Sequence, residues 1–245
     1  MPDSATGIGP CIAMAAKREI WNAFCRDHNV AERSVPLFAH AADGSVETAV
    51  YGRDQRPLLT RSREMEAMVI ETVERILSTP SAEGMIYMMH RLDQEGRVVP
   101  LYIGKAGRYG RSGALISANI ASIRTNGGKF ARWGTNYAYH VGDLSAAVLP
   151  GHAPGKVVAK YQRWATRLFE NAPSPRPVQR FPVRFWCADW HPEMKGIWPE
   201  FGACPLAFME YLLIGVAGLL FPADLLNDEG VNRSPPPLDS NTPPN

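Results

Sequence analysis

Two tyrosines, and the apolar runs that carry them, are the first candidates for chemistry in this chain. Tyr87 ends the run 84–87 (GMIY), and Tyr102 stands inside the run 101–105 (LYIGK). Residues 93–97 (DQEGR) lie between the runs and have the glycine and charges typical of a hairpin loop. We therefore expect two antiparallel strands that bring both phenols to one site. For either tyrosine alone, ordinary strand packing is the better interpretation.

A single carboxylate in an apolar segment is the second candidate. Residues 205–221 are apolar except for Glu210. An ionised carboxylate in such surroundings is costly unless it meets a metal ion, a cation or several donors. Mg²⁺ (or Mn²⁺) would suit one carboxylate completed by waters and a substrate phosphate. The alternative is a helix end or a groove open to water, where a glutamate is tolerated without a function.

The same segment approaches the length of a membrane span. A carboxylate near its middle would cost roughly 2.5–3.5 kcal/mol on insertion scales, and no lysine or arginine closely flanks either end. We therefore expect a buried helix, and no contact with a membrane.

The basic residues are unevenly distributed. The formal net charge is only +2, yet residues 96–142 contain no Asp or Glu. The basic residues of that stretch are Arg97, Lys105, Arg108, Arg111, Arg124, Lys129 and Arg132. Such a patch favours contact with the phosphates of a polyanion, although a solvated basic face is a common alternative. DNA is the expected partner, with Arg108, Lys129 and Arg132 as its contacts.

Composition indicates a soluble globular protein in a reducing cytoplasm. The chain has 245 residues, 45% of them hydrophobic and 20% charged. Cys11, Cys25, Cys187 and Cys204 are dispersed, without the spacing of a zinc site or a disulfide framework. The N-terminus lacks the basic and apolar regions of a secretory signal.

Periodicity and punctuation predict the elements that would position these residues. Helices are expected over residues 15–27, 61–77, 114–125, 156–170 and 205–220, and further strands over 136–141 and 181–190. This order predicts an α+β fold, a small mixed or antiparallel sheet with flanking helices and an N-terminal helical extension. We expect a mostly helical accessory region over residues 1–80, a core over 81–233 and a disordered tail over 234–245.

The order Tyr87, Tyr102, Glu210, Pro222 and Asn227 resembles the GIY-YIG nuclease family. In that family a hairpin with two tyrosines precedes a helix with an arginine. A later helix then carries a metal-binding glutamate, and an asparagine follows. The chain is similar to the branch that contains restriction endonucleases, in which long insertions separate the core elements. The resemblance covers residues 84–233, with 106–201 matching only loosely.

The resemblance implies a metal-dependent endonuclease that hydrolyses phosphodiester bonds in duplex or branched DNA, of restriction, defence or mobile-element type. It implies that Tyr87 helps to deprotonate the attacking water as a phenolate, and that Tyr102 orients that water or contacts the phosphate. Glu210 would bind Mg²⁺ (or Mn²⁺), and Asn227 would fix the geometry by hydrogen bonding. One such core has one metal site, so cutting both strands would need a homodimer on DNA or two events.

The arginine is where the chain departs from the family. The family's spacing falls on Ser112, which makes Arg111 the first candidate and Arg124 the second. With Lys105, this arginine would stabilise charge on the phosphoryl oxygens. The family's histidine is missing, and His140 could replace it only by folding back. Two alternatives stay open: a binding protein on the same fold without cleavage, and a structural or partner-binding domain whose tyrosines are core residues.

Overall fold

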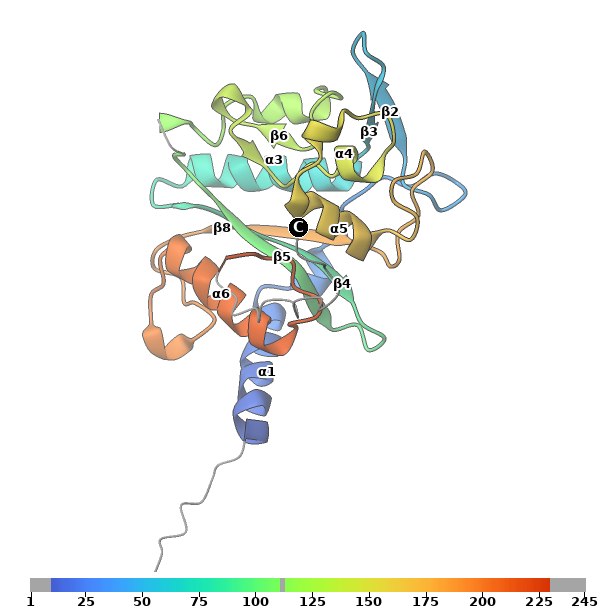
Figure 1. The fold of residues 1–245 in the computed structure, drawn as a ribbon. Helices are drawn as coiled ribbons and strands as arrows, with labels where there is room; N and C mark the ends of the chain where they lie inside the picture. Colours follow the sequence, from blue (N-terminus) through green and yellow to red (C-terminus); the bar gives the residue numbers. More distant parts are fainter. Residues whose placement is uncertain (1–9, 111–112, 230–245) are drawn as a thin grey trace, which may run out of the picture.

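A central antiparallel sheet organises the molecule in the computed structural model, which describes residues 10–110 and 113–229 (Figure 1). The strands are β1 (Val35–Pro36), β8 (Arg184–Trp190), β4 (Gly84–Leu92) and β5 (Val98–Gly107), in the order β1-β8-β4-β5. All neighbouring pairs are antiparallel. The predicted α+β class with a small antiparallel sheet and flanking helices is confirmed.

The predicted hairpin is the pair β4 and β5. Tyr87 lies opposite Gly104 and Met89 opposite Tyr102, with a register irregularity just beyond Met89. The connecting loop closes on Asp93, whose Oδ1 accepts from the backbone N–H groups of Glu95 and Arg97 at 2.9 Å each. Since β5 is the last strand in the order, its outer edge is open to segments other than strands.

Helices cover both faces of the sheet (Figure 1). On one face α3 (Arg63–Ser78) packs on β8, with Met65, Val69, Val73 and Ile76 buried. Helix α3 begins at Ser62, whose side chain accepts from the N–H of Met65 at 3.0 Å. On the same face as α3 lies α5 (Ala159–Leu168), which contributes Trp164 to that core.

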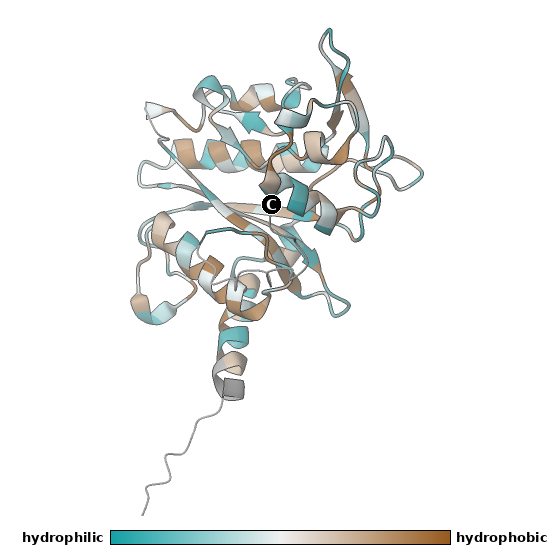
Figure 2. Cartoon of the chain, in the orientation of Figure 1, coloured by the Kyte–Doolittle hydropathy of each residue, from teal (hydrophilic) through white to brown (hydrophobic). Residues whose placement is uncertain are grey.

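The other face carries α6 (Leu206–Leu220) and α1 (Pro10–Asp27). Their buried side chains include Trp21 of α1 and Met209 and Leu213 of α6, which form a second core with Ile86 and Ile103 of the hairpin. Figure 2 shows hydrophobic residues on the sheet and the helices that enclose it, and a hydrophilic tip on the hairpin. In the described residues, no helix is long and apolar enough to cross a membrane.

The helix predicted over residues 114–125 is wrong. Only Ile120–Arg124 is helical there, as a short 3-10 helix (η2), and turns precede it. Gly113 and Asn119 have positive φ angles of 73° and 59°, and the N–H of Ile116 donates back to the carbonyl of Arg108 at 3.1 Å. These left-handed residues reverse the chain where an α-helix would need continuous right-handed backbone.

The strand predicted over residues 136–141 is reduced to β7 (Tyr139–His140), paired with β6 (Arg132–Trp133). Asn136 and Tyr137 have φ angles of 56° and 57°, which is incompatible with a strand. The remaining elements are α2 (Val30–Arg33), β2 (Thr48–Tyr51), β3 (Arg56–Leu59), η3 (Thr135–Tyr137), α4 (Ser145–Val148), η4 (Pro154–Lys156) and η5 (Pro199–Phe201).

The region before residue 80 belongs to the same body as the hairpin. Strand β1 pairs with β8 of the central sheet, and α3 packs on that sheet. The region contains α1, α2 and α3 together with the short strands β1, β2 and β3. The boundary expected at residue 80 therefore does not separate two cores. The tail expected over 234–245 lies outside the described residues.

Candidate active site at the edge of the hairpin

The two hairpin tyrosines lie side by side on the face of the sheet that carries α3 and α5. Their ring centroids are 6.2 Å apart, and Tyr102 also contacts Trp164 of α5 at 4.7 Å. The ring of Tyr87 passes over Gly104: a Cβ at Gly104 would lie 2.6 Å from both Cζ and Oη of Tyr87. Because Gly104 has no side chain, the Tyr87 hydroxyl can lie over β5.

Glu210 approaches β5 from the opposite face. It lies on α6, which packs on β5, and its carboxylate forms an ion pair with the ammonium group of Lys105. Its side chain is 17% exposed. Lys105 follows Gly104 in β5, so the tyrosines on one face and Glu210 on the other meet around a single glycine. The structure thus brings Tyr87, Tyr102, Lys105 and Glu210 together.

Asn227 holds the strand that carries these groups. Its Oδ1 accepts from the N–H of Ile103 at 3.0 Å, and its Nδ2 donates to the carbonyl of Ile103 at 2.8 Å. The N–H of Leu226 donates to the carbonyl of Leu101 at 2.7 Å. The segment after α6 therefore covers the outer edge of β5 on both sides of Tyr102. With 5% of its surface exposed, Asn227 is a positioning residue.

Both phenols are harder to ionise than a free tyrosine. Burial, followed by the nearby Tyr102 and Glu210, raises the pKa of Tyr87 well above its ordinary value. Burial and then Glu210 raise the pKa of Tyr102. The interaction between the two hydroxyls further raises the pKa of Tyr87 and lowers that of Tyr102. The phenolate expected for Tyr87 is therefore not its resting form, because the phenol is buried and lies near a carboxylate.

Helix α5 supplies cations that the sequence analysis missed. The Nζ of Lys160 lies 4.8 Å from the ring centroid of Tyr102. Arg163 and Arg167 follow on the same helix, paired with Asp228 and, at 2.8 Å, with Asp224. The signal was present, since basic residues recur at positions 160, 163 and 167, the spacing of one helix face. These three positions lie outside the acid-free stretch 96–142.

The two predicted catalytic arginines have different outcomes. Arg111 lies outside the described residues. Arg124 is exposed and ends η2, which packs on α3 and β6 in the layer beyond α3 (Figure 1). Lys129, one of the predicted DNA contacts, lies in the same layer, where its Nζ is 5.4 Å from the ring centroid of Tyr137.

Arg132 acts on groups closer to the hairpin tyrosines than Arg124 does. Strand pairing puts it opposite His140. Partial burial of the imidazole, then the charges of Arg132 and Lys160, lower the pKa of His140. Arg132 also lowers the pKa of Tyr161, which burial and Asp143 raise, and Tyr161 in turn acts on the phenols of the hairpin. The Nε of Arg132 is buried and has no hydrogen-bond partner. His140 thus lies beside Arg132 in the β6–β7 pair.

Glu210 is the carboxylate that could bind a divalent cation beside the two phenols. Within the described residues, no cluster of three or more His, Cys, Asp and Glu side chains is arranged to hold a metal. Glu210 fits a hard cation whose other ligands are waters and a phosphate. In the structure Lys105 neutralises this carboxylate instead.

No family model, no curated protein and no solved structure matches this chain. The assignment of a function therefore rests on the geometry of the site, together with the resemblance of its motifs.

Proposed function

We propose that the chain is a metal-dependent endonuclease that hydrolyses DNA phosphodiester bonds at the edge of β5. One observation carries the proposal: Tyr87 and Tyr102 on one face of the sheet and Glu210 on the other converge around Gly104. Core tyrosines would not need a glycine beneath one hydroxyl and a carboxylate across the strand. Lys105 pairs with Glu210 and Lys160 lies over the ring of Tyr102, and these cations favour an anionic substrate there.

The interaction between the two hydroxyls gives a route for the proton of the attacking water. As the water oxygen bonds to phosphorus and the bond to the leaving sugar oxygen breaks, Tyr87 accepts the water's proton. In the same step Tyr87 gives its own proton to Tyr102, the partly buried Tyr102 passes one to solvent, and the leaving sugar oxygen takes a proton from solvent. No step leaves a charge on the buried Tyr87, which is consistent with its raised pKa.

The charged side chains stabilise the phosphoryl oxygens as they gain charge. Glu210 would hold the divalent cation, which when bound supplies Lewis-acid stabilisation and cancels the charge that raises both phenol pKa values. Lys105, released from Glu210, can then contact a phosphoryl oxygen. We assign the role of the family's arginine to Arg132, because its charge acts on Tyr161 and Tyr161 in turn acts on both hairpin phenols.

A second candidate is a DNA-binding protein on the same fold that does not cleave. The ion pair between Lys105 and Glu210 favours it, since it leaves the resting carboxylate already neutralised. Cleavage and binding are distinguished by incubating purified protein with supercoiled plasmid, with Mg²⁺ or with EDTA. Metal-dependent nicking that is lost in Tyr87→Phe and Glu210→Ala supports the enzyme. Salt-sensitive binding by all three proteins without nicking would support the binding protein.

Matched controls separate the site from general damage. Tyr51→Phe removes a hydroxyl from an exposed tyrosine of β2, and Glu74→Ala removes an exposed carboxylate from α3. Both controls should nick plasmid at the wild-type rate.

A further inference from the structure

A cavity of about 810 Å³ opens beside Lys105, at the end of β5 beyond the tyrosines. Its volume lies within the range of roughly 300–1,000 Å³ that is typical of ligand pockets. The walls come from the loop before β4, the end of β5 and the beginning of α6, and they include Ser81, Lys105, Arg108, Tyr109, Pro192 and Leu206. Lys105 also pairs with Glu210, so this cavity, the flank pocket, adjoins the proposed active site.

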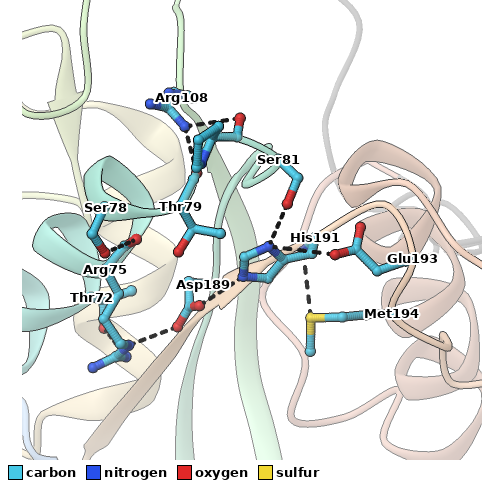
Figure 3. Close-up of polar contacts among 11 residues, drawn as sticks. Thr72, Arg75, Ser78, Thr79, Ser81, Arg108, Asp189, His191, Glu193 and Met194 are labelled. Atoms are coloured by element: carbon cyan, nitrogen blue, oxygen red, sulfur yellow. Dashed lines mark hydrogen bonds and ion pairs between the residues drawn. The ribbon is translucent and has the colours of Figure 1, made fainter.

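Two cations give the flank pocket the character of a phosphate site. Lys105 stands on the side nearest Glu210, and Arg108 stands farther along. One guanidinium nitrogen of Arg108 donates to the carbonyls of Thr79 at 2.8 Å and Pro80 at 3.3 Å, which fixes the group at the rim (Figure 3). The carboxylate of Glu83, also in the wall, accepts from the N–H of Leu206 at 2.6 Å. It is therefore occupied by the first residue of α6.

An exposed aromatic ring completes the flank pocket. Tyr109 has 67% of its surface exposed, which is unusual for a large ring beside a cavity. The apolar residues of the wall are mainly proline, alanine and leucine: Pro80, Ala82, Pro192, Pro205, Leu206 and Ala207. An exposed aromatic ring in a wall that is otherwise partly apolar suits the flat face of a nucleic-acid base.

A polar network holds the wall of the flank pocket in place (Figure 3). Ser81 Oγ and His191 Nδ1 are 3.4 Å apart, and His191 Nε2 lies 3.0 Å from Asp189 Oδ2. The Nε of Arg75 donates to the other oxygen of Asp189 at 2.8 Å. These contacts tie the loop before β4 to α3 and β8. The pocket is thus formed before any ligand arrives, which limits the entropy lost on binding.

We propose that the flank pocket binds one unstacked nucleotide of single-stranded DNA next to the scissile phosphate, with its base on Tyr109 and its phosphate between Lys105 and Arg108. The proposal rests on the proposed function and narrows its substrate: a strand with a splayed nucleotide, as in a single-stranded or branched site, fits better than continuous duplex. A base inside an intact duplex is already stacked on its neighbours and is not available to Tyr109.

The test is the anisotropy of a fluorescein-labelled single strand, with a duplex of the same sequence as reference, in EDTA so that cleavage does not interfere. Tyr109→Ala should weaken binding of the single strand by roughly 5- to 150-fold and leave duplex binding unchanged. Tyr109→Phe should bind like wild type, because it keeps the ring. Arg108→Met should weaken binding and lower its salt dependence. The matched control is Tyr51→Ala, on the exposed strand β2.

Three outcomes would contradict the proposed role of the flank pocket. They are unchanged single-strand binding by Tyr109→Ala, an equal loss of affinity for single strand and duplex, and complete displacement of the strand by adenosine monophosphate. The last would assign the pocket to a free nucleotide. Failure of the pocket and failure of the nuclease are distinguishable. Plasmid nicking with normal single-strand binding by Tyr109→Ala overturns the pocket alone, whereas Tyr109-dependent binding without nicking overturns the nuclease alone.

Discussion

The ring of Tyr87 lies over Gly104, and a methyl group on Gly104 would come within 2.6 Å of the Tyr87 hydroxyl oxygen. This relationship links the two halves of the hairpin more closely than strand pairing requires. It means that the glycine of one strand determines where the phenol of the other can reach.

Gly104→Ala is therefore expected to displace the Tyr87 ring. Overpacking of this kind costs about 1–3 kcal/mol in the free energy of unfolding, and nicking should fall at least about tenfold because the hydroxyl moves. Urea denaturation and plasmid nicking measure the two effects. Gly127→Ala is the control, since a Cβ there meets nothing within 4 Å. In the Tyr87→Leu background, Gly104→Ala should lower the free energy of unfolding by less than it does in wild type. Additive effects of the two substitutions on that free energy would contradict the steric explanation.

Asn227→Ala should destabilise the edge of β5. The substitution leaves the buried N–H and carbonyl of Ile103 without partners, which costs about 1–3 kcal/mol for each group left unsatisfied. Asn227→Asp keeps the acceptor but loses the donor, and so should restore only part of the stability. Urea denaturation gives the values, with Gln94→Ala in the exposed hairpin loop as control. Wild-type stability in Asn227→Ala would refute the positioning role.

Arg132, rather than Arg124, should be needed for nicking. Loss of a donor to a developing oxyanion lowers the rate by roughly 10²–10³-fold, and we expect this of Arg132→Met. Arg124→Met should nick normally, because Arg124 ends η2 beyond α3. Rates under single-turnover conditions with saturating Mg²⁺ distinguish the two. A large loss of nicking in Arg124→Met with a normal rate in Arg132→Met would assign the role to Arg124 instead.

Lys105 should compete with a metal ion for Glu210. Breaking a partly exposed ion pair changes affinity little, by roughly 0.2–1 kcal/mol, so Lys105→Met should bind Mn²⁺ up to about fivefold more tightly in calorimetric titration. Nicking should nevertheless fall, since the ammonium group is lost to the phosphate. Lys195→Met, at an exposed site, is the control. Weaker Mn²⁺ binding by Lys105→Met would show that Glu210 is not the ligand.

The raised pKa of Tyr87 has a consequence for stability. Its phenol holds its proton more tightly in the folded state than in the unfolded chain, where the pKa is about 10. This contribution to stability is fully present below about pH 10 and is lost as the pH rises further. In Tyr87→Phe the free energy of unfolding should therefore fall less steeply above about pH 10 than in wild type. Equal slopes in urea denaturation at several alkaline pH values would contradict the environment described for Tyr87.

Local patterns predicted the parts of the site that lie on regular elements. The hairpin with Tyr87 and Tyr102, and the apolar helix with Glu210, follow from the period and punctuation of the sequence. The structure of residues 113–141 could not be predicted in this way. Its left-handed residues, such as Asn119 and Asn136, interrupt the regular elements without a strong sequence signal. Asparagine tolerates the left-handed conformation, but an asparagine in the sequence does not by itself predict it.

Local sequence patterns could not predict which distant residues meet at the site, for a different reason. Lys160 reaches Tyr102 only because α5 packs on the same face as the hairpin tyrosines. Arg132 acts on Tyr161 of α5 only because the fold brings β6 toward that helix. That packing is set by sheet order and layer assignment, which no window of sequence specifies. The same applies to Asn227, whose partner Ile103 lies in a strand far back along the chain.

The rate of Mg²⁺-dependent nicking by wild type and Tyr87→Phe, measured side by side at matched stability, tests the central claim most directly. The substitution keeps the ring over Gly104 and removes only the hydroxyl. We predict that wild type nicks supercoiled plasmid, that EDTA abolishes this, and that Tyr87→Phe is slower by roughly 10²–10⁴-fold. Equal rates for the two proteins, or no nicking by wild type in Mg²⁺ or Mn²⁺, would contradict the proposed active site.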